Sequence, residues 1–120
     1  TFDLSDALLA GNLAQSIKIF QYLIASGEPS SLILWSISKE MRLLMQLFEQ
    51  PHNALQLGIW KTKVSAYQQA LRRLIPQEFL TWPSLLLRID SSIKGLGHEN
   101  PEHLIQQAIA SLCGKTLFHA

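Results

Sequence analysis

The feature that most constrains the fold is the stretch Ser30–Glu49, which contains neither glycine nor proline. Its apolar residues recur at every third or fourth position, so they share one face of a helix. These residues are Ile33, Ile37, Leu44, Leu47 and Phe48, and the face is widened by Leu34, Met41 and Met45. Leu43 lies almost opposite them. Because a helix that is apolar on more than one side is normally covered by other helices, we predict that Ser30–Glu49 is the central helix of a small bundle.

Five further segments are predicted to be helical. They are residues 4–10 and the segments between Asn12 and Gly27, Trp60 and Leu74, Pro76 and Gly95, and Asn100 and Gly114. Asp3, Asn12 and Asn100 are suited to cap the first, second and last, because their side chains accept hydrogen bonds from first-turn amides. Pro83 interrupts the fourth and is expected to kink or split it. No strand pattern is visible, so the predicted fold class is all-α, a compact bundle of about five to six helices in one domain over residues 1–120.

Composition limits the functions open to the chain. A hydrophobic fraction of 48% predicts a packed core, and a net charge of +1 offers no electrostatic case for strong binding to DNA or an anionic membrane. No apolar run is long enough to span a bilayer, and no signal peptide pattern is present, which predicts a cytoplasmic protein. Because the sequence opens on Thr1 without an initiator methionine, we expect a fragment of a longer chain.

The sequence contains no motif for catalysis or for nucleotide binding. It has no glycine-rich phosphate loop, no HExxH and no GxSxG. His98 and His103 lie five residues apart across a helix start, which does not place them on one helix face as metal ligands. Cys113 is the only cysteine and ends an apolar helix, so it is predicted to be a small buried residue rather than a nucleophile. We therefore predict no catalytic, cofactor or metal site.

Two groups of residues are candidates for binding. A basic set could contact nucleic acid, but a solvated helix face is the favoured interpretation; it consists of Lys61, Lys63, Arg72 and Arg73. Among the three tryptophans, Trp60 and Trp82 fall on predicted core stripes and are expected to be buried. Trp35 lies beside the main stripe of the central helix, and the sequence leaves core and interface equally open for it.

The order of four motifs resembles the C-terminal domain of the delta subunit of bacterial DNA polymerase III. The motifs are FDLSDALLAGNLAQSIKIFQYL, GEPSSLILWSISKEMRLLMQL, IWKTKVSAYQQALRRL and LLLRIDSSIKGL. The resemblance covers residues 2 to about 113, and the ending ASLCGKTLF resembles the close of proteobacterial members. The chain departs from the family at Pro83, at Ile75, where a capping serine is common, and in the connection Gln50–Gly58, for which we find no pattern or role.

The resemblance implies a non-catalytic subunit of a DNA polymerase holoenzyme (a DNA-directed DNA polymerase). In that family the delta subunit belongs to the clamp loader, which places the sliding clamp on primed DNA. Its C-terminal helical bundle joins those of the ATPase subunits of the tau/gamma type and of delta-prime in a circular collar. The clamp would be bound by an N-terminal region absent from this sequence, DNA would be contacted only indirectly, and no cofactor or membrane would be involved.

The candidate collar contacts are Trp35, Leu43, Leu117 and Phe118, because they fall outside the main apolar stripes. The alternative is that these side chains fold back onto the bundle. Two other functions remain open. One is an unrelated helical adaptor that binds a peptide or partner helix in a groove. The other is direct nucleic-acid binding through the basic set, which would be strongly salt-dependent.

Overall fold

The computed structural model describes residues 3–115, and all the regular secondary structure in this part of the chain is helical, without a strand. The elements are α1 (Leu4–Leu9), α2 (Leu13–Ala25), α3 (Ser30–Glu49), a 3-10 turn η1 (Lys61–Lys63), α4 (Val64–Arg73), α5 (Pro76–Phe79), α6 (Trp82–Ile93) and α7 (Pro101–Leu112). The predicted all-α class is confirmed, and α3 has the predicted bounds. None of the helices in residues 3–115 is long and apolar enough to cross a bilayer.

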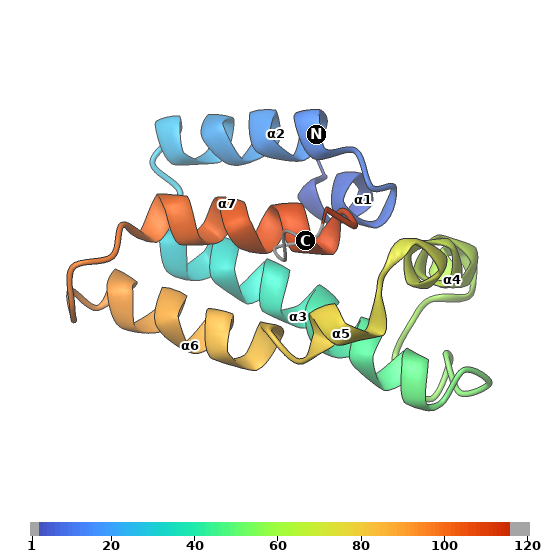
Figure 1. The fold of residues 1–120 in the computed structure, drawn as a ribbon. Helices are drawn as coiled ribbons and strands as arrows, with labels where there is room; N and C mark the ends of the chain where they lie inside the picture. The colour runs from blue at the N-terminus through green and yellow to red at the C-terminus, as the bar shows by residue number, and fades with distance from the viewer. Residues whose placement is uncertain (1–2, 116–120) are drawn as a thin grey trace.

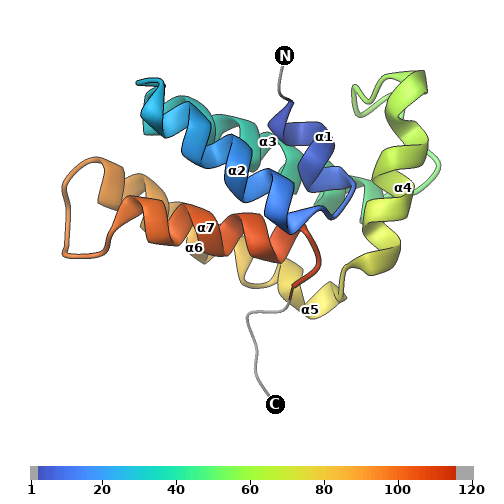
Figure 2. The same cartoon turned by 90° about the horizontal axis from the view of Figure 1, so that it is seen from above.

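The helices form a bundle with α3 at its centre (Figure 1). α2, α7 and α6 lie above one another in this view, and α3 runs behind α7. α3 contacts α1, α4, α6 and α7, whereas α2 packs on α1 and α7. Seen from above, α4 runs across one end of the bundle, beside α1 (Figure 2). α3 and α1 therefore both contact helices of the stack and also α4 at this end.

The core is built around the inner face of α3. Ile37, Met41 and Leu44 are completely buried there, as the helical periodicity predicts. Opposite them lie the buried side chains of the other long helices, among them Phe20, Trp82, Ile89, Ile105 and Ile109. The predicted burial of Trp82 is confirmed. Phe48 stays half exposed at the end of α3, where its ring packs edge-on against Phe79 with the centroids 5.1 Å apart.

The three predicted helix caps are present. The side chain of Asp3 accepts a hydrogen bond from the amide of Asp6 at 3.2 Å, and Asn12 does the same for Gln15 at 3.0 Å. Asn100 accepts from two first-turn amides of α7, at 2.8 and 3.3 Å. These contacts satisfy amide groups that have no partner within their own helix.

Pro83 splits the helix predicted between Pro76 and Gly95 into α5 and α6. Leu80 and Thr81 link the two, so Pro83 lies in the first turn of α6. At that position the missing amide proton costs nothing, because first-turn amides have no intrahelical acceptor. One predicted helix thus becomes two, which raises the total to seven α-helices in residues 3–115.

The predicted burial of Trp60 is wrong. The helix in this region begins only after it, and Trp60 has extended backbone, with φ −62° and ψ 142°. Its side chain is 76% exposed, whereas the preceding Ile59 is buried. The apolar stripe of α4 therefore starts one turn later than the sequence indicates, and Ile59 takes the core position expected for Trp60.

Arg73 has a structural role that the sequence does not show. Its Nη2 donates to the carbonyl of Leu9 at 2.7 Å and reaches that of Leu8 at 3.5 Å, at the C-terminal end of α1. The half-buried guanidinium therefore caps α1 from the end of α4 and complements its partial negative charge. The prediction of a solvated basic face is wrong for this member of the set.

Gly11 leaves room for the Arg73 guanidinium. It ends α1 with φ +73°, and a Cβ there would lie 2.5 Å from Arg73 Nε. Gly27, just after α2, has a similar φ of +85°, but the space around it is open. We predict that Gly11→Ala destabilises the domain by more than Gly27→Ala. Both changes incur the left-handed backbone cost of about 1–2 kcal/mol, but only the first displaces Arg73.

The measurement is chemical denaturation of the two variants in the native and in the Arg73→Ala background. In the Arg73→Ala background the two glycine substitutions should cost the same. Equal costs in the native background would show that Arg73 moves aside freely and that its cap on α1 contributes little.

Candidate interaction surface

A buried carboxylate links α3 to α4. Glu40 points inward from α3 and is only 1% exposed, and the Tyr67 hydroxyl from α4 donates to both of its oxygens, at 2.7 and 2.8 Å. A buried carboxylate needs such a donor, because it has lost its water. This contact fixes the position of α4 across the end of the bundle.

Burial shifts the acidity of both groups in this pair. It raises the pKa of Glu40, although the Tyr67 hydrogen bond and the charge of Lys39 act in the opposite direction. It also raises the pKa of Tyr67, and the hydrogen bond to Glu40 adds to that rise. The tyrosine therefore remains a hydrogen-bond donor across the physiological pH range.

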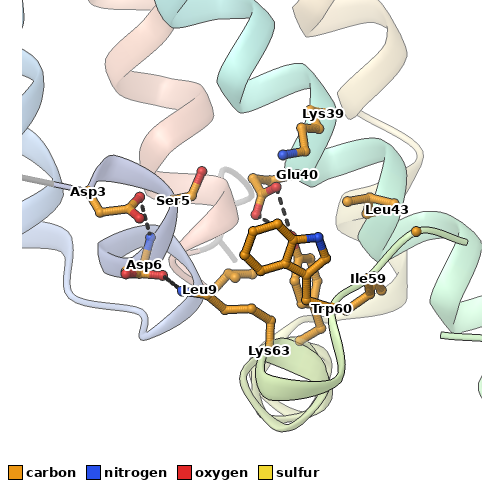
Figure 3. Close-up of a pocket in the computed structure, with 12 residues that line it drawn as sticks. Asp3, Ser5, Asp6, Leu9, Lys39, Glu40, Leu43, Ile59, Trp60 and Lys63 are labelled. Atoms are coloured by element: carbon orange, nitrogen blue, oxygen red, sulfur yellow. Dashed lines mark hydrogen bonds and ion pairs between the residues drawn. The ribbon is translucent and has the colours of Figure 1, made fainter. Parts of the chain in front are cut away.

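The pair lines a recess of about 230 Å³ between α1, α3 and the start of α4 (Figure 3). Two pairs of its polar groups are engaged with one another: Lys63 Nζ lies 2.5 Å from Asp6 Oδ1, and the Glu40 carboxylate accepts the Tyr67 hydroxyl. Trp60 lies over the recess. Within residues 3–115 no group of three or more His, Cys, Asp or Glu side chains is placed to hold a metal ion. The contacts in the recess join α1, α3 and α4 to one another.

A second buried network connects α5, α6 and α7. Trp82 Nε1 donates to Ser111 Oγ at 2.7 Å, and the Ser111 hydroxyl donates to Glu78 Oε2 at 2.6 Å. From the sequence, Glu78 is only a first-turn acid of a helix, yet it is buried. No local pattern could have predicted this network, because Glu78 and Ser111 lie 33 positions apart.

Neither the cysteine nor the two histidines considered in the sequence analysis lies in a reactive site. Cys113 is buried, with Sγ 3.6 Å from Ser16 Oγ, and burial raises the pKa of its thiol. A thiol of this kind is a poor nucleophile, so the prediction of a small buried residue is confirmed. His98 and His103 are both exposed, His98 in the loop before α7 and His103 in the first turn of that helix.

The four candidate contact residues from the sequence differ in their exposure. Trp35 lies on the outer face of α3 with 64% of its surface exposed, and Leu32 beside it is 56% exposed. Leu43 is only 5% exposed and belongs to the core, because α1 and the segment around Ile59 cover the side of α3 that carries it. The expectation that Leu43 is available to a partner is therefore not met by this domain. Leu117 and Phe118 lie outside the described residues.

Other exposed leucines lie on α6 and just before it. Leu80 and Leu87 are both largely exposed, and Leu87 lies on the side of α6 opposite its buried residues Leu85 and Ile89. Neither is among the candidates from the sequence; Leu87 lies within α6, and Leu80 lies in the link between α5 and α6. They are a second apolar area on the surface.

Comparison with known proteins identifies one family. A family model described as DNA polymerase III delta subunit, C-terminal domain, matches residues 1–112 of the 120-residue chain. Comparison with curated proteins and with solved structures gave no match.

The raised pKa of Glu40 predicts a pH-dependent stability. In the unfolded chain this carboxyl ionises near its ordinary pKa of 4.5, whereas in the folded domain it ionises only at higher pH. Its contribution to stability is therefore complete below pH 4.5 and falls as the pH rises through the folded-state pKa. We predict that Glu40→Gln, which retains an acceptor for Tyr67, removes this fall.

The measurement is the free energy of unfolding between about pH 4 and pH 8. Glu49→Gln, at the exposed end of the same helix, is the matched control and should follow the wild type. Tyr67→Phe should cost about 1.5–3 kcal/mol at neutral pH and less in acid, because only the ionised carboxylate loses a charge-assisted hydrogen bond. Parallel pH profiles for wild type and Glu40→Gln would contradict the prediction.

Proposed function

This chain belongs to the family defined by the C-terminal domain of the DNA polymerase III delta subunit, and we propose that it acts as a non-catalytic oligomerisation domain. In this proposal it takes its place in the collar of the clamp loader, the assembly that places the sliding clamp on primed DNA. Its neighbours are the C-terminal domains of the ATPase subunits of the tau/gamma type and of delta-prime. Contact with the sliding clamp belongs to another region of a longer delta subunit, DNA is approached only indirectly, and the compartment is the cytoplasm.

The observation that carries the proposal is the exposure of Trp35. An indole that is 64% exposed on the central helix leaves a large apolar surface in water. The core does not need this residue, because Ile33, Ile37 and Met41 already fill the inner face of α3. Tryptophan is enriched at the energetic centres of protein interfaces, which fits a domain whose work is assembly.

The polar groups of the domain support binding rather than catalysis. Its buried polar contacts join one helix to another, as the Glu40–Tyr67 pair and the Trp82–Ser111–Glu78 network do. Nucleic-acid binding by the basic set has less support, because Lys63 pairs with Asp6 and Arg73 caps α1.

The test is native mass spectrometry of this chain mixed with the full-length ATPase and delta-prime subunits from the same organism. We expect a defined hetero-oligomer that contains one copy of the chain. Trp35→Glu should weaken its incorporation roughly thirtyfold, equivalent to about 2 kcal/mol for an interface hot spot.

The matched control is Leu55→Glu, because Leu55 is 62% exposed but lies in the loop after α3. It should bind like the wild type. If the folded wild-type chain joins no complex, the proposal fails, and an adaptor that binds a different partner becomes the better explanation.

A further inference from the structure

The outer face of α3 carries positive charge beside its exposed apolar residues. We call the outer face the side formed by Leu32, Trp35, Lys39 and Arg42, all of which are exposed. Their spacing of three, four and three positions places them on one side of the helix. The buried residues Ile37, Met41 and Leu44 occupy the opposite side.

Lys39 is positioned by the tryptophan. Its Nζ lies 5.9 Å from the centre of the Trp35 ring, within the range of a cation–π contact. The indole and the ammonium group therefore form one unit, in which an apolar ring is bordered by a cation. Arg42 follows one turn later on the same side.

Within residues 3–115 the acidic groups around this face form no ion pair with its two cations, although the charge of Lys39 lowers the pKa of Glu40. Among residues 3–115 neither Lys39 nor Arg42 makes an ion pair, whereas Lys63, Arg88 and Lys94 each have a carboxylate partner. Glu40 is turned inward to Tyr67, and Glu49 lies at the far end of α3. From α1, Asp3 and Asp6 reach the recess that Lys39 borders, but Asp6 is engaged by Lys63.

We infer that the neighbour that covers the outer face presents an apolar pocket for Trp35 rimmed by carboxylate side chains for Lys39 and Arg42. This inference rests on the proposed function and adds the chemistry of the partner. A cation that loses water at an interface must gain an opposite charge, and such complementarity also steers the approach of the two surfaces. Nucleic acid is the less suitable partner, because the face offers only two cations and the chain has a net charge of +1.

The test measures binding of this chain to the full-length neighbouring subunits at several salt concentrations. Arg42→Glu should weaken binding at least tenfold at about 0.1 M salt, and the loss should shrink at about 1 M salt as charges are screened. Arg72→Glu on α4 is the matched control, with the same change of charge at an exposed arginine, and should bind like the wild type. Circular dichroism and thermal unfolding verify that each variant is folded.

The outcomes separate this inference from the proposed function. If Trp35→Glu disrupts the complex but Arg42→Glu binds as well as Arg72→Glu, the acidic partner is excluded and the proposed function stands. If the wild-type chain binds none of these proteins, the proposed function itself fails. If a single-stranded oligonucleotide binds and Arg42→Glu abolishes that binding, the face is a nucleic-acid site and the inference is overturned.

Discussion

Burial of the inner face of α3 is the constraint on which the other elements depend. This helix is twenty residues long and contacts α1, α4, α6 and α7, so four helices bury apolar surface against it. Ile37 and Leu44 at its middle are completely buried. Because one side is committed in this way, only the opposite side remains for partners. The same helix thus supplies both the core and the candidate interaction surface, on two faces separated by its own backbone.

Polar contacts determine the relative orientation of the helices, which apolar packing alone does not. Apolar packing has little directionality, so it brings helices together without selecting one orientation. The Tyr67 hydroxyl on Glu40 and the Arg73 guanidinium on the end of α1 each need a defined distance and angle. The Trp82–Ser111–Glu78 network does the same for α5, α6 and α7. These contacts give the bundle a single arrangement.

Local patterns predicted most of the fold, and contacts between distant residues account for most of the errors. The bounds of α3, the caps at Asp3, Asn12 and Asn100 and the break at Pro83 all depend on neighbouring residues, so they could be read from the sequence. The burial of Trp60 could not be predicted in this way, because periodicity does not show where a helix begins after a loop. The roles of Glu78 and Arg73 depend on partners 33 and 64 positions away, and no local signal reports such pairs.

The candidate surface, too, could be predicted only in part from local sequence patterns. The position of Trp35 beside the main stripe identifies it, but the sequence could not decide between core and surface, since that depends on which helices pack beside α3. Leu43 meets the same criterion and is buried by α1 and the loop segment around Ile59.

The attachment of α4 has a consequence for internal motion. Among its own residues only Tyr67 and Ala70 are buried, and polar contacts to α1 and α3 hold it at the end of the bundle. An element with so little buried apolar surface opens at a lower free energy than the core helices. Its backbone amides should therefore exchange with deuterium from solvent through excursions that leave α3, α6 and α7 protected. This end of the domain is therefore expected to move on its own while the central helix keeps its place.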